Sequence, residues 1–118
     1  MSNVTLYPEL ANYIFDYCTR FRTENETKAL QHFIAMEKSD NGRKEGFYSF
    51  FKERNMVSDD AEVLKLLEHG FQTFKKNVVQ RIYDEHKHEL ELNLCPKCYQ
   101  IARTPQAKQC RFCFYNWH

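Results

Sequence analysis

The sequence predicts a mainly α-helical chain that ends in a small β-hairpin. Apolar side chains recur at helical spacing through the first 94 of the 118 residues. Four of the five cysteines lie in the last 24 residues as two Cys-x-x-Cys pairs, which are typical of short turns between strands. We therefore expect a bundle of about five helices over residues 1–94 and a separate small domain over residues 95–118.

The first helix is predicted from Pro8 to Arg22, where apolar residues form one stripe. Pro8 suits a first helical turn because its missing N–H would have no partner there. Cys18 lies on the stripe and is expected to be a buried, unreactive thiol, since no basic or histidine neighbour is visible that would lower its pKa. A second helix should begin at Thr23, with Glu26 completing a capping box.

Three further helices follow the turn that Asp-Asn-Gly predicts at residues 40–42. They are expected over residues 44–54, from Ser58 to Gly70, and from Phe71 to about Asn93. The last of these would run almost directly into the cysteine pairs and connect them rigidly to the bundle. The expected core includes Phe33, Phe50, Leu67, Phe74 and Ile82.

The two cysteine pairs predict a structural zinc site. Four thiolates around one ion form a closed tetrahedral shell, which leaves no position for a substrate or an activated water. Two disulfides, two redox-active pairs or an iron centre would use the same four residues. Residues 1–10 carry no secretory signal, and this favours zinc and a cytoplasmic location. The eleven residues between the pairs suit a hairpin of strands 99–103 and 113–117. The predicted ligands are Cys95, Cys98, Cys110 and Cys113.

At these residues the chain resembles the zinc-ribbon class, whose two knuckles read Cys-Pro-x-Cys and Cys-x-x-Cys. Residues 94–118 also look like the tail of a group of small, uncharacterised bacterial proteins. This resemblance implies zinc ligation and carries no activity. The class usually has glycine directly after each knuckle, where a positive φ is convenient, whereas this chain has Tyr99 and Phe114.

Charge is distributed unevenly along the chain. Residues 95–118 contain four basic residues and no acidic one, so residues 1–94 contain 13 basic and 16 acidic residues. Four thiolates around one divalent ion would leave a net negative charge that nearby cations could offset. The residues that could instead contact a nucleic acid or another partner are Lys97, Arg103, Lys108, Arg111, Tyr99 and Tyr115.

Signals for an enzyme are weak in this sequence. Three glycines cannot build a phosphate-binding loop or a dinucleotide fingerprint, and no local signature of a nucleophile is present. No apolar run is long enough to span a bilayer. We expect no enzyme, no small-molecule substrate and no membrane segment. One acidic and histidine-rich cluster is expected to be a solvated helix face: Asp84, His86, His88, Glu89 and Glu91.

Two function classes are consistent with these observations. The first is a protein-interaction module, in which an acidic helical body presents a rigid surface to a protein partner, as inhibitors and immunity proteins do. The alternative is a nucleic-acid-binding protein that uses the aromatic and basic residues of the zinc-binding segment. Some of those aromatic rings are expected to pack inward, with Trp117 covering the junction with the long helix.

Overall fold

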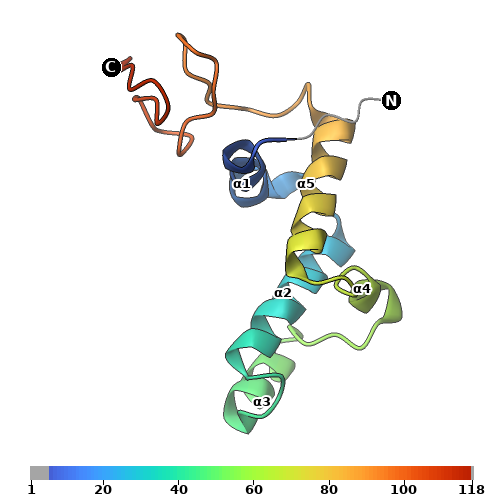
Figure 1. Ribbon diagram of the computed structural model, residues 1–118. Helices are drawn as coiled ribbons and strands as arrows, with labels where there is room; N and C mark the ends of the chain where they lie inside the picture. Colours follow the sequence, from blue (N-terminus) through green and yellow to red (C-terminus); the bar gives the residue numbers. More distant parts are fainter. Residues whose placement is uncertain (1–5, 118) are drawn as a thin grey trace. The chain divides into compact units, whose positions relative to one another are not determined.

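The computed structural model describes residues 6–117, and these residues are mainly helical (Figure 1). Their elements are listed in order along the chain. They are α1 (Pro8–Tyr17), the 3-10 turn η1 (Thr19–Phe21), α2 (Glu24–Lys38), α3 (Glu45–Glu53), α4 (Ala61–Lys65) and α5 (Phe71–His86). No helix in this part of the chain has the length and apolar character needed to cross a bilayer.

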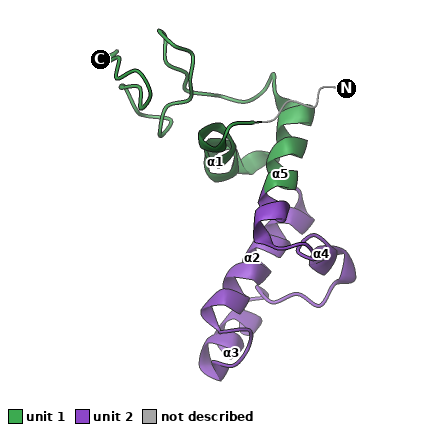
Figure 2. Cartoon of the chain, in the orientation of Figure 1, with its two compact units in different colours: residues 1–21, 76–118 green, residues 22–75 purple. Residues whose placement is uncertain are grey.

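The chain divides into two compact units (Figure 2). Unit 1 contains the described residues up to Phe21 together with those from Lys76 onward, and unit 2 contains Arg22–Lys75. The division groups residues by their contacts and does not test where one domain ends and the next begins. The domain boundary predicted at residue 94 therefore stays a prediction.

Unit 1 buries one face of α1 together with the second half of α5. The α1 residues Leu10, Tyr13, Ile14 and Phe15 are buried. The first helix ends at Tyr17, earlier than predicted, because Cys18 leaves helical geometry and η1 follows. The η1 turn places the Phe21 ring 4.5 Å from the His86 ring, and the Phe21 carbonyl accepts a hydrogen bond of 2.7 Å from Arg81.

Helix α5 ends at His86, so the predicted continuation to Asn93 is wrong. The Glu89 N–H bonds to the His86 carbonyl and closes a turn, and residues 90–93 have no regular secondary structure. Backbone carbonyls of this segment instead accept hydrogen bonds from unit 1 side chains. Tyr13 Oη donates to the Glu91 carbonyl at 3.3 Å, and Arg20 donates to the Glu89 carbonyl at 3.3 Å.

The predicted β-hairpin between the two knuckles is not shown in the described residues. Two isolated antiparallel bridges occur instead, Leu94 with Ile101 and Gln109 with Asn116. Each Cys-x-x-Cys turn reverses the chain, so the segment after a knuckle meets the segment directly before it. Residues 99–103 and 113–117 therefore do not pair with each other.

Unit 2 is built around α2, which packs against α3 and α4. Its start was predicted correctly: the Glu26 N–H donates to Thr23 Oγ1 at 3.1 Å, and the Thr23 N–H donates to the Glu26 carboxylate at 2.9 Å. This reciprocal pair satisfies two N–H groups that the helix itself leaves without partners. The turn after α2 was also predicted, and Gly42 has the positive φ of 89° that favours glycine.

The core of unit 2 differs from the predicted one on α3. Phe51 is buried there, whereas Phe50, which was predicted to be buried, is 46% exposed. Phe74 is buried as predicted, and the Phe33 and Phe71 rings stack at 4.3 Å.

A hydrogen bond between His32 and the loop before α4 makes unit 2 sensitive to acid. The Ser58 N–H donates to His32 Nδ1 at 3.0 Å, which requires an unprotonated nitrogen. Burial lowers the pKa of His32 below its ordinary value of 6.5. Because the folded state favours neutral His32, this hydrogen bond contributes fully to stability at a pH above the pKa of His32 in the unfolded chain. The contribution is lost as the pH falls through the lower pKa of His32 in the folded state.

We expect His32→Asn, which keeps an acceptor close to the Nδ1 position but does not titrate, to lose this dependence. Urea midpoints measured between neutral and mildly acidic pH should fall more steeply for the wild type than for His32→Asn. Equal slopes for the two proteins would contradict this role of His32.

Candidate metal centre

The four predicted ligands come together at one point in unit 1. All four Sγ atoms lie within 4.8 Å of one another. Cys95 Sγ is 3.6 Å from Cys113 Sγ, and Cys98 Sγ is 3.5 Å from Cys110 Sγ. A tetrahedral ion with metal–sulfur bonds of about 2.3 Å requires sulfur–sulfur distances of roughly 3.8 Å. Disulfide sulfurs lie only about 2.05 Å apart, so the arrangement fits a four-thiolate metal site and not two disulfides.

Both knuckles fold in the same way, around the first cysteine of each pair. Cys95 Sγ accepts from the N–H groups of Lys97 and Cys98, at 3.4 and 3.5 Å. Cys110 Sγ accepts from the N–H groups of residues 112 and 113, at 3.3 and 3.4 Å. Such backbone donors stabilise thiolate charge and orient the sulfur toward the ion.

The same donors affect the acidity of the Cys110 thiol. Burial raises the pKa of Cys110, but the N–H groups of Cys113 and Phe112, together with the side chains of Cys98 and Cys113, lower the pKa to about 6. A thiol that ionises readily is suited to metal binding, which requires the thiolate form.

The residue after each knuckle has a left-handed backbone conformation. Tyr99 has a φ of 62° and Phe114 a φ of 64°. Glycine adopts such angles freely, whereas an L-residue with a side chain is strained by roughly 1–2 kcal/mol. Both turns therefore have, directly after the second cysteine, the positive φ that glycine favours, although an aromatic residue occupies each position.

The candidate metal-binding segment, residues 95–117, is attached to the residue directly before α1 and to the segment after α5. The Ile101 N–H donates to Tyr7 Oη at 3.0 Å, and the Tyr7 and Phe112 rings meet edge to face at 6.2 Å. The Asn93 side-chain amide donates to the carbonyls of Thr104 and Ala107 at 2.9 and 2.8 Å. The sequence alone does not identify Tyr7 or Asn93 as contact residues. Their partners lie far away along the chain, and such contacts produce no periodic pattern in the sequence.

The predicted contact residues lie around the knuckles. Lys97 Nζ is 6.0 Å from the centroid of the Tyr115 ring, which stacks on Trp117 at 6.4 Å. Trp117 therefore contacts Tyr115, and its covering of the junction with the long helix stays a prediction. The side chains of Tyr99, Arg103 and Lys108 are exposed.

The acidic and histidine-rich cluster does not form a second metal site. Within residues 6–117, the cysteines are the only group of three or more potential ligands close enough to share an ion. Asp84 accepts a hydrogen bond of 2.9 Å from Gln80, and His86 Nδ1 contacts the Glu89 carboxylate. His88 is exposed.

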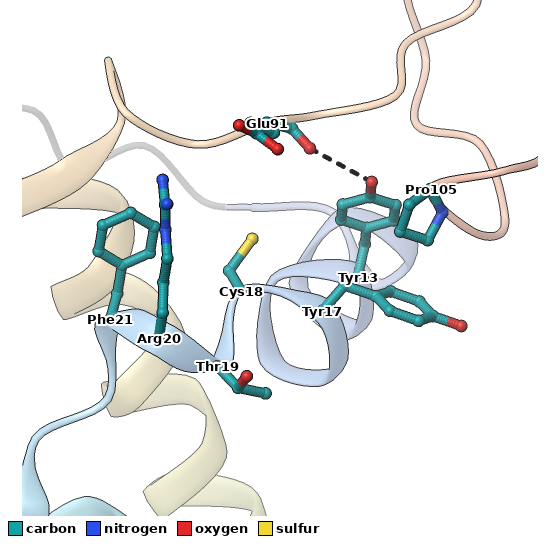
Figure 3. A pocket seen from close by; sticks show the side chains of 8 residues that line it. All are labelled: Tyr13, Tyr17, Cys18, Thr19, Arg20, Phe21, Glu91 and Pro105. Atoms are coloured by element: carbon teal, nitrogen blue, oxygen red, sulfur yellow. Dashed lines mark hydrogen bonds between the residues drawn. The ribbon is translucent and has the colours of Figure 1, made fainter.

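One pocket of about 300 Å³ lies beside the C-terminal end of α1 (Figure 3). The Cys18 thiol points into it between Arg20 and Tyr13. Burial raises the pKa of Cys18, with a smaller opposing effect from Arg20, so the thiolate needed for nucleophilic chemistry is scarce. The lining residues are Tyr13, Tyr17, Cys18, Thr19, Arg20, Phe21, Glu91 and Pro105.

Comparisons with known proteins identify no relative. No protein-family model matches the chain, and neither does any curated protein or solved structure that was searched. What can be concluded about function therefore comes from the residues and their geometry.

Proposed function

We propose that the chain is a non-enzymatic, zinc-containing interaction module that binds a protein partner, as an inhibitor or an immunity protein does. In this proposal the four cysteines hold one zinc ion in knuckles of the zinc-ribbon type. Protein sulfur would fill all four positions, so the ion would stabilise structure rather than activate a water molecule. The sulfur–sulfur distances and the matching knuckle geometry support this assignment.

One exposed face of α3 in unit 2 supports the proposal that the chain binds a protein partner. Phe47 is 53% exposed and Phe50 is 46% exposed, and they lie about one helical turn apart. The Arg54 guanidinium carbon is 3.6 Å from the centroid of the Phe50 ring, and Lys44 Nζ is 6.0 Å from that of Phe47. Aromatic and arginine side chains are enriched among the residues that contribute most to protein–protein binding.

The charge of this face indicates the chemistry of the partner. Residues 43–54 contain four basic and two acidic residues, whereas residues 1–94 as a whole contain more acidic than basic ones. A cation held over an aromatic ring keeps hydrogen-bond donors for a carboxylate on its other side. The partner surface that fits best has an apolar centre surrounded by acidic groups.

A binding experiment with a matched control tests this proposal. A protein captured from the native host by the wild type would be purified and titrated against the wild type and the double variant Phe47→Ala/Phe50→Ala. We expect the double variant to bind at least about tenfold more weakly, because it removes the centre of the face. The control, Leu64→Ala/Leu66→Ala, removes two other side chains of unit 2 that are each 38% exposed, and should bind as the wild type does. Equal affinity of the wild type and the Phe47/Phe50 variant would contradict the proposal.

A further inference from the structure

The two knuckles carry exposed aromatic rings at corresponding positions. Tyr99 is 73% exposed and Phe114 is 70% exposed, and each directly follows the second cysteine of its knuckle. These are the two residues of the segment with a strained, positive φ. An aromatic side chain in water at a position that glycine would occupy without strain contributes little to the fold, and such strain indicates a role in binding.

The cations of this segment are available to a ligand. None of the side chains of Lys97, Arg103, Lys108 and Arg111 forms an ion pair or hydrogen bond within the described part of the chain. The knuckle sulfurs accept hydrogen bonds from backbone N–H groups instead. Two of these cations lie near rings: Lys97 near Tyr115 at 6.0 Å, and Arg111 near Phe112 at 5.9 Å.

Exposed rings and cations that share one short segment, two of them as ring–cation pairs, suit a single-stranded nucleic acid. Exposed aromatic rings stack on the faces of unpaired bases, and neighbouring cations neutralise the phosphates. A duplex hides its base faces, and the described residues after α5 contain no helix that could enter a groove.

We propose that the aromatic and basic surface formed by Tyr99, Phe114, Tyr115 and the four cations binds single-stranded DNA or RNA without strong sequence preference. This site is separate from the α3 face, and the inference does not rest on the proposed protein partner. The metal ion has no contact with the ligand in this proposal. Its role is to hold both ring-bearing turns in place.

Fluorescence anisotropy with labelled oligo(dU) and oligo(U), which differ only in the 2′-hydroxyl, tests the proposal on the zinc-loaded protein. The decisive variant is Tyr99→Gly/Phe114→Gly, which removes both rings and also relieves the strain at positive φ. We expect its affinity to fall at least about tenfold, since stacking on an aromatic ring contributes to binding for each base. Its zinc retention against a competing chelator should equal or exceed that of the wild type, which separates lost binding from lost folding.

Charge is tested by the triple variant Arg103→Gln/Lys108→Gln/Arg111→Gln. It should flatten the dependence of log affinity on log salt by a slope of about 2, as expected when three phosphate contacts to a single strand are removed. Tyr17→Ala serves as the control, because this ring is also aromatic and is 48% exposed but lies on α1. A preference for oligo(U) would indicate contacts to the 2′-hydroxyl, and equal affinities would indicate stacking and phosphate contacts alone.

Several outcomes would overturn the inference. The first is that neither oligonucleotide binds at low salt, and the second is that the Tyr99/Phe114 variant keeps the wild-type affinity. The third is an equal loss of affinity in Tyr17→Ala, and the fourth is that duplex binds as tightly as single strands. In the first case the rings would remain as a surface for a protein.

Discussion

Replacing Cys95 by serine is expected to abolish zinc binding and to unfold the metal-binding segment. Zinc bound in a small structural site contributes about 10–16 kcal/mol, and this energy is used for folding the segment around it. With the knuckle lost, the Ile101 N–H would no longer be held against Tyr7. Native mass spectrometry with elemental analysis should find one zinc ion in the wild type and none in Cys95→Ser.

The matched control for this variant is Cys18→Ala, which removes a cysteine that lies outside the metal cluster. It should keep its full zinc content. Circular dichroism of Cys95→Ser should retain most of the helical signal, because unit 2 has a core of its own. Stoichiometric iron in the wild type, or two intact disulfides, would show that the metal assignment is wrong.

Phe74→Ala is expected to have the largest effect on the stability of the helical core. Phe74 is 2% exposed, and its ring is 5.9 Å from that of Phe71. Truncating a buried phenylalanine leaves a cavity and costs about 3–5 kcal/mol. A domain of this size is stable by roughly 5–15 kcal/mol, so much of the stability would be lost.

Phe47→Ala removes the same side chain from an exposed position, where we expect a change of less than about 0.5 kcal/mol. Urea unfolding followed by circular dichroism compares the two variants with the wild type. A similar loss of stability in both would mean that burial does not distinguish these positions.

Features that depend on neighbouring residues were predictable from the sequence. The capping box of Thr23 and Glu26 lies within one turn, and the Cys-x-x-Cys spacing determines each knuckle. The capping box and the knuckles can therefore be located from the sequence without knowledge of tertiary contacts. The metal ligands required one long-range assumption, that the two pairs share an ion, and the sulfur positions agree with it.

Features that depend on distant residues were missed. No glycine or proline lies between Phe71 and Asn93 to mark the end of helix α5 in the sequence. Its end at His86 accompanies hydrogen bonds that Arg20 and Tyr13 make with the following segment. On α3, Phe50 and Phe51 are adjacent and chemically identical, so which of them is buried depends on how α3 packs in unit 2, where it contacts α2.

The division of unit 1 along the sequence has a consequence for the order of folding during synthesis. Unit 2 is one continuous segment, so all of its residues are synthesised before the part of unit 1 that begins at Lys76. Unit 1 requires both ends of the chain, and its contact between Tyr7 and Ile101 joins residues 94 positions apart. Helix α1 is therefore synthesised well before the residues that it contacts in unit 1, and those contacts can form only after the later segment has been made.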